Sequence, residues 1–362
     1  MKTGKSIVEL ATEIQRQAAL KRDFIVDTTA VSMVEMAAAP VSLSFADQTL
    51  NIGETAHDQI GEHCGIPAKY YDKMRGEAPE LLVANVNTWF AKRPAKQMIR
   101  TLDGQARAFL SNKYRPLDNL ELAEAVLPVL SQIGVEVISS EITEKRLYIK
   151  GVDRKVMLEI PAGHSFGDGT HTIVHTRQLY PSITISNSEI GHGSLSVRGG
   201  TFDGFCTNLS IFEKRSTRTN HVGRKFEALG DITELLSDHS RRLNDAALWS
   251  SLKDVVVATF DEAKFAELVD EIKGTQDQKI EGDVVKVVEV TAQRFGMNDG
   301  ERKSVLDHLI HGGDLSRFGL YNAVTRTAED LPSYDRATEF ERFGGQIIEL
   351  AKNDWQAIAE AA

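Results

Sequence analysis

The chain contains few cysteines and no long apolar run. Cys64 and Cys206 are the only cysteines among its 362 residues, which excludes a disulfide framework and favours a reducing compartment. No segment approaches the roughly 20 apolar residues that a membrane-spanning helix needs. The first residues mix polar and apolar side chains, unlike the apolar centre of a signal peptide. We therefore expect a cytoplasmic protein without membrane contacts.

Positive charge is scarce overall but is concentrated in the middle of the chain. Lys and Arg number 42 against 52 Asp and Glu, giving a net charge of −10. Residues 1–90 hold 8 basic and 12 acidic residues, 91–225 hold 19 and 13, and 226–362 hold 15 and 27. The middle region is thus basic within an acidic protein, which points to an anionic partner for that region alone.

Hydrophobic periodicity predicts three regions in an α+β protein. Residues 1–90 form a small N-terminal unit of helices and short strands, with a helical spacing of apolar residues over 4–22. Residues 91–225 combine a helix at 118–132 with strands joined by short turns, which predicts an antiparallel sheet packed with helices. Residues 226–362 show repeated amphipathic patterns and form a mainly helical, acidic C-terminal region.

Two basic runs within the middle region are candidates for phosphate contacts. The first lies within 91–115 and the second within 212–225. Tyr114, between two basic residues, could stack on a base or shape a groove. The predicted phosphate contacts are Arg93, Lys96, Arg100, Arg107, Lys113, Arg115, Lys214, Arg215, Arg218, Arg224 and Lys225. The alternative is that each run is a solvated surface neutralised by nearby carboxylates.

The sequence offers little support for catalysis. It contains no Walker A loop and no complete dinucleotide-binding fingerprint, so we expect no cofactor and assign no catalytic residue. The enzyme alternative is a metal-dependent nuclease or hydrolase centred on Asp168, His171, His175 and His192. The β-branched residues between His171 and His175 favour a strand, which holds the two rings too far apart for one zinc ion. Cys206 is interpreted as a buried small hydrophobic residue.

Several motifs resemble those of a known family. They are Asn187-Ser188-Glu189-Ile190-Gly191-x-Gly193, Cys206-Thr207-Asn208 followed by His221, an Ala-Phe-Leu-Ser-Asn-Lys-Tyr-Arg-Pro-Leu-Asp-Asn stretch at 108–119, and Tyr334-Asp335-Arg336-Ala337. Together they resemble the phage- and plasmid-associated family catalogued as domain of unknown function nine-three-two, from about residue 50 to the end. Members often have glycine after the Cys-Thr-Asn run, where this chain has Leu209. The resemblance implies a mobile-element context without assigning a reaction.

The layout also resembles, at the level of fold alone, the phage single-strand annealing proteins. We therefore predict a protein that binds single-stranded DNA and promotes annealing or recombination, as a homo-oligomer. Asn187, Ser188, Glu189 and Asn208 would hold a loop network. The acidic C-terminal region would mediate assembly, contact a host or phage replication protein, or compete with DNA for the basic face. A third alternative is a phage or plasmid structural or interaction protein without affinity for nucleic acid.

Overall fold

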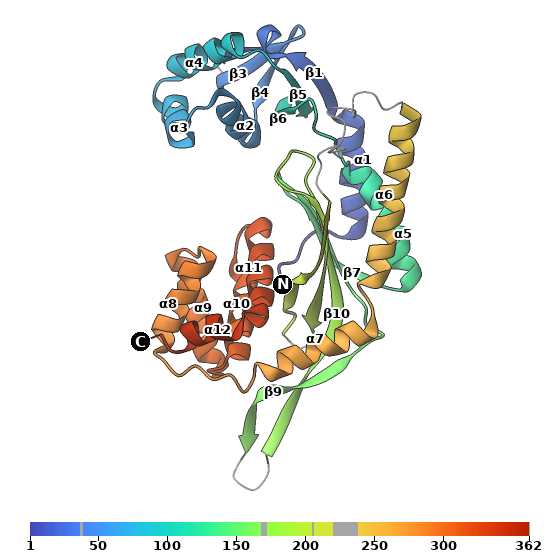
Figure 1. Ribbon diagram of the computed structural model, residues 1–362, viewed down its shortest axis with the longest axis vertical. Coiled ribbons are helices and arrows are strands. Elements are labelled where there is room, and N and C mark those ends of the chain that lie inside the picture. The colour runs from blue at the N-terminus through green and yellow to red at the C-terminus, as the bar shows by residue number, and fades with distance from the viewer. Residues whose placement is uncertain (37–38, 168–171, 205, 220–237, 362) are drawn as a thin grey trace.

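The computed structural model describes residues 1–361 except 37–38, 168–171, 205 and 220–237 (Figure 1). It confirms an α+β protein with antiparallel sheet packed against helices and a helical C-terminal region. Two sheets organise the described residues. The first belongs to an N-terminal lobe, residues 22–111, and the second to the remaining body of the protein.

The N-terminal lobe is a six-stranded sheet covered on one face by three helices. Its strands are β1 (Arg22–Asp27), β2 (Ser32–Met36), β3 (Ala39–Phe45), β4 (Gln48–Ile52), β5 (Lys96–Leu102) and β6 (Gln105–Ser111), in the order β1-β5-β6-β4-β3-β2. The pairing is antiparallel except between β4 and β6. The crossover from β4 to β5 contains α2 (Glu54–Cys64), α3 (Ala68–Glu77) and α4 (Pro79–Lys92). Leu43, Ile60, Phe90 and Ile99 lie in the resulting core.

The body contains an antiparallel sheet in the order β12-β11-β10-β8-β7, with β9 paired to β10. The strands are β7 (Glu136–Ile142), β8 (Leu147–Val152), β9 (Leu158–Gly167), β10 (Thr172–Asn187), β11 (Leu195–Asp203) and β12 (Leu209–Thr219). The first part of β10 pairs with β9 in a hairpin that projects from the body, and the later part lies between β8 and β11 (Figure 1). β10 is thus one long strand that has different partners along its length.

Helices cover both faces of the second sheet. Successive residues along each strand point to opposite faces, so the sheet contributes side chains to a core on either side. Ile183 and Ile185 pack into a cluster with α1 (Ile7–Leu20), α5 (Asn119–Ile133) and α6 (Asp238–Ala258). The other face meets a helical layer, in which Tyr321 and Phe340 contribute to the largest core. That layer comprises α7 (Glu262–Gly274), α8 (Val284–Phe295), α9 (Asp299–Gly312), α10 (Arg317–Asp330), α11 (Tyr334–Glu349) and α12 (Lys352–Ala359).

The sheet topology places one region boundary differently from the sequence-based division. β5 and β6 complete the first sheet, so the N-terminal lobe continues past residue 90. α1 packs against β7 and α5 instead, so the lobe is an insertion between α1 and α5. The predicted boundary near residue 225 lies outside the described residues.

Candidate functional site

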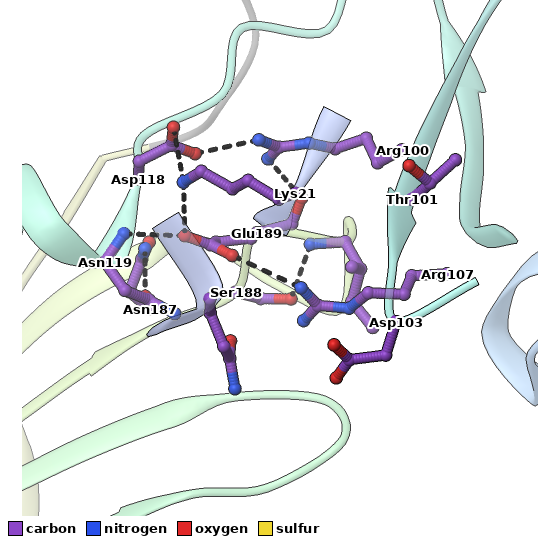
Figure 2. Close-up of polar contacts among 12 residues, drawn as sticks. Lys21, Arg100, Thr101, Asp103, Arg107, Asp118, Asn119, Asn187, Ser188 and Glu189 are labelled. Atoms are coloured by element: carbon purple, nitrogen blue, oxygen red, sulfur yellow. Dashed lines mark hydrogen bonds and ion pairs between the residues drawn. The ribbon is translucent and has the colours of Figure 1, made fainter. Parts of the chain in front are cut away.

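Two separately predicted sets of residues meet where the N-terminal lobe contacts the body. Arg100 on β5 and Arg107 on β6 come from the first basic run, and Glu189 comes from the family-like motif after β10. Figure 2 shows these side chains converging with Lys21 and Asp118. We call the six charged residues Lys21, Asp23, Arg100, Arg107, Asp118 and Glu189 the interlobe network.

Arg100 is the central cation of the interlobe network. Its Nε donates to Asp23 Oδ1, its Nη2 to Asp118 Oδ1 and its Nη1 to the backbone carbonyl of Glu189, each at 2.8 Å (Figure 2). The side chain is only 4% exposed. Burial alone would lower the pKa of Arg100, but Asp118 and Asp23 together raise it. Arg100 therefore stays charged and directs its hydrogen bonds inward.

Glu189 is the central carboxylate. Its Oε1 accepts a hydrogen bond of 2.8 Å from the backbone N–H of Asn119 and lies 3.3 Å from Lys21 Nζ, while Oε2 lies 3.5 Å from Arg107 Nη1. Lys21 Nζ also lies 2.7 Å from Asp118 Oδ2. Three cations thus face three carboxylates. Burial lowers the pKa of Arg107, and Glu189 opposes that change.

The loop after β10 is held by hydrogen bonds to both the body and the N-terminal lobe. Asn187 Nδ2 donates to the carbonyl of Leu117 at 2.7 Å, and Ser188 Oγ donates to that of Lys145 at 2.8 Å. Gln59 Nε2 donates to the carbonyl of Ile190 at 2.8 Å. Gly191 has a φ of +83°, and a Cβ there would lie 2.8 Å from Leu110 Cδ2. Of the residues predicted to hold a loop network, Asn187, Ser188 and Glu189 make contacts here, whereas Asn208 lies in the turn before β12. Gln59 is a further contact that the sequence did not indicate.

The expected continuous basic track is interrupted in this conformation. Arg100 and Arg107 are enclosed by the interlobe network. Tyr114, expected to stack on a base or shape a groove, is half-buried and donates its hydroxyl to the carbonyl of Ser188 at 3.1 Å. Arg115 forms an ion pair with Asp245 on α6. These residues lie at a junction between two folded units, where their partners come from distant parts of the chain.

Part of the first basic run does remain at the surface, around the end of α4 and the start of β5. Lys92, Arg93 and Lys96 are exposed. Lys96 lies in register with Asp27 on β1, whose pKa is lowered by hydrogen bonds from Thr29 and, less strongly, by Lys96. The guanidinium carbon of Arg93 lies 4.6 Å from the centroid of the half-buried Trp89 indole, and Lys92 Nζ lies 5.9 Å from it. We call Trp89, Lys92, Arg93 and Lys96 the Trp89 patch. Trp89 and Lys92 were not among the predicted contacts.

The second basic run lies on a different sheet. Lys214 and Arg215 on β12 line a groove of about 490 Å³ between that strand and helices α6 and α7. Glu267, Glu271 and Glu349 line the same groove. The backbone N–H of Lys214 donates to Glu349 Oε1 at 2.8 Å. Nearby carboxylates therefore offset this positive charge.

Some predicted positions in the second run cannot be located. Arg224, Lys225 and His221 lie outside the described residues, as does the side chain of Arg218. Lys113 is exposed beside Tyr114 and has contacts of its own within the chain. The two basic runs are consequently not joined into one surface by the residues that the structure describes.

The proposed metal site is only partly covered by the structure. Asp168 and His171 lie outside the described residues, as does the side chain of His175. His192 Nε2 lies 2.8 Å from Thr55 Oγ1, and burial lowers the pKa of the ring, which favours the neutral form. Within the described ranges, no three His, Cys, Asp or Glu side chains are grouped as metal ligands would be.

The Cys-Thr-Asn run forms the turn between β11 and β12. Cys206 is half-buried, less than expected, and burial raises the pKa of its thiol. Asp203 Oδ1 accepts a hydrogen bond from the backbone N–H of Cys206 at 3.1 Å. Thr207 has a φ of +54°, so the left-handed residue of this turn lies two positions before Leu209. Asn208 is buried next to it.

Comparisons with protein-family models, with curated proteins and with solved structures found no match. The likeness to the phage- and plasmid-associated family remains a prediction, and the functional argument rests on the geometry described above. Among the helices that the structure describes, none combines the length and the apolar character needed to cross a bilayer.

Proposed function

We propose that the protein binds single-stranded DNA through the Trp89 patch and promotes annealing or recombination. The observation that carries the proposal is the Trp89 indole with two exposed cations, Lys92 and Arg93, beside it, followed along the chain by a third exposed cation, Lys96, at the start of β5. Single-strand binding requires a ring on which a base can stack and positive charge along the phosphate backbone. The mobile-element context implied by the family resemblance is consistent with this activity.

The present contact between Arg93 and Trp89 suggests how a strand would bind. A guanidinium 4.6 Å from the ring centroid covers an aromatic face by a cation–π interaction. A base can replace the guanidinium on that face, and the freed Arg93 can then contact a phosphate. In a duplex the base faces are stacked within the helix, so a single strand is the better ligand for this arrangement.

Annealing would require several copies to present strands to one another, which is why we also propose a homo-oligomer. The acidic C-terminal region would mediate this assembly or bind a replication protein of the host or phage. No cofactor is required, because pairing of complementary strands is itself favourable. The proposed assembly and the role of the acidic region both depend on DNA binding.

Fluorescence anisotropy with a labelled oligothymidylate tests the proposal at 50 and 200 mM salt. The triple variant Lys92→Ala/Arg93→Ala/Lys96→Ala should bind more weakly. The slope of its log affinity against log salt concentration should be smaller in magnitude by about 2, since each phosphate contact contributes roughly 0.7. The matched control is Lys253→Ala/Lys303→Ala/Lys352→Ala, which removes three exposed lysines from the helical region. Absence of binding at 50 mM salt, or equal losses in both variants, contradicts the proposal.

Three further measurements separate the alternatives. Complementary oligonucleotides should anneal faster with the protein than without it, and the patch variant should lose that effect. Shortening of the oligonucleotides only when Mg²⁺ or Mn²⁺ is added would favour a nuclease. Oligomers that do not change on addition of DNA in light scattering would favour a structural role.

A further inference from the structure

The N-terminal lobe is joined to the body chiefly through polar contacts. One hydrophobic cluster lies wholly within the lobe, from Phe24 to Phe109. The other clusters identified among the described residues contain only residues of the body. The chain crosses between the two units at Lys21–Arg22 and again between β6 and α5. Polar interfaces of this kind generally permit relative motion of the units they join.

A pocket of about 260 Å³ that is open to solvent lies beside the interlobe network. Leu102 and Arg107 line it from the lobe, while Arg16, Ile142 and Ile190 line it from the body. Separating the lobes would bring water to charged groups, whose hydration offsets much of the lost ion pairing. The contact is therefore suited to opening.

The surface that opening would uncover is basic. Along β5, Ile99 points into the lobe core, so Lys96 and Arg100 share the opposite face of the sheet, about 13 Å apart. Arg107 on β6 follows Ala106, which also belongs to the core, and so shares that opposite face. The loop after β10 covers this face, and Glu189 contributes both a carboxylate and a carbonyl to its arginines. Glu189 thus occupies the position that a phosphate would take.

We propose that the interlobe junction is a second polyanion-binding surface, closed in this conformation by Glu189 and opened when single-stranded DNA binds. Arg100, Arg107 and Lys21 then contact phosphates and extend the Trp89 patch along β5 and β6. This inference rests on the proposed function for its ligand. The opening itself can be measured without DNA, because weakening the interlobe network should shift the lobe even though Arg16 on α1 still pairs with Asp103 of the lobe.

Spin labels at Glu77 on α3 and Glu262 on α7 report the distance between the lobe and the helical layer. Both positions are exposed, and Cys206 is replaced by serine in every sample while Cys64 remains buried. Double electron–electron resonance is recorded with and without oligothymidylate. Binding of DNA should shift the distribution of distances between the two labels to a new maximum that is resolved from the first. Glu189→Gln should shift it in the same direction without DNA, and should bind DNA several-fold more tightly.

Glu136→Gln is the matched control, because it removes a carboxylate from an exposed ion pair with Arg154 on the body. It should change neither distance nor affinity. If Glu189→Gln does not fold, Asp118→Asn removes a different partner of Arg100 and should produce the same shift. An unchanged distance on saturation with DNA that binds the Trp89 patch overturns the inference and leaves the proposed function intact. If Glu189→Gln shifts the distance distribution but the protein binds no DNA, the proposed opening stands and DNA as its ligand is overturned.

Discussion

The ammonium group of Lys150 on β8 lies 2.6 Å from Oε2 of Glu341 on α11, and both side chains are fully buried. Lys150 Nζ also lies 4.5 Å from the centroid of the Tyr334 ring. Burial lowers the pKa of Lys150, and Glu341 opposes that change. The pair connects the second sheet to the helical layer.

Replacing one member of this pair should destabilise the protein strongly. Glu341→Leu leaves a buried ammonium group without its counter-charge, which typically costs about 3–5 kcal/mol. The double variant Lys150→Met/Glu341→Leu should recover most of that loss, because an apolar pair needs no compensation. Urea unfolding of the two single variants and the double variant measures the coupling. Additive losses would contradict the prediction.

Gly345 should tolerate no larger residue, because α11 approaches β12 closely there. A Cβ at Gly345 would lie 2.0 Å from the backbone carbonyl oxygen of Ile211. Gly345→Ala should therefore lower the free energy of unfolding by about 1–3 kcal/mol, as overpacking does elsewhere. Gly76→Ala is the control, since its Cβ would meet nothing within 4 Å in helix α3 and should stabilise by up to about 1 kcal/mol. Thermal unfolding that ranks the two variants in the opposite order would refute this.

Stability should fall in mild acid because His57 is buried in the neutral form. Its Nδ1 lies 2.9 Å from the Tyr71 hydroxyl, and burial together with Arg75 lowers its pKa from 6.5 to about 4. The unfolded chain then binds the proton more readily, so stability is complete above pH 6.5 and declines toward pH 4, by about 3 kcal/mol in total. His57→Gln should show a smaller decline in urea unfolding across this range. Parallel pH profiles for both proteins would exclude this role for His57.

Trp89 should contribute to DNA affinity through its ring. Loss of one stacked base costs about 1–3 kcal/mol, so Trp89→Ala should weaken oligothymidylate binding by roughly 5- to 150-fold. Trp89→Phe should lose much less, because a smaller ring still stacks. Binding should also quench tryptophan fluorescence in the wild type and less so in Trp89→Phe, since Trp355 is buried and Trp249 packs against the core of the body. Equal affinity of the alanine variant and the wild type would rule out stacking at this position.

Local features of the fold could be predicted from the sequence. The helical spacing of apolar residues over 4–22 indicated α1, and the helix predicted at 118–132 corresponds to α5. The assignment of β5 and β6 to the first sheet was not predicted, because it depends on the pairing of β4 with β6 across the intervening helices. The break between α11 and α12 falls at 350–351, where neither glycine nor proline marks it.

The candidate site could be predicted only in its components. The first basic run and the Asn-Ser-Glu motif were both recognised, yet their contact was not. Glu189 lies about 90 residues from Arg100 along the chain, and residue type does not reveal such a partner. The Trp89 patch was partly missed because its central ring lies just before the basic run. Attention to aromatic residues one helical turn from a cation would have found it.

The insertion of the N-terminal lobe between α1 and α5 has a consequence for synthesis. Leu10 and Ile14 of α1 are buried against elements that follow the whole lobe. As the polypeptide leaves the ribosome, α1 cannot pack until α5 and the second sheet have been synthesised. The lobe has all of its own strands before that point. We therefore expect the lobe to fold during translation before the surrounding body, leaving the apolar face of α1 exposed to chaperones in the interval.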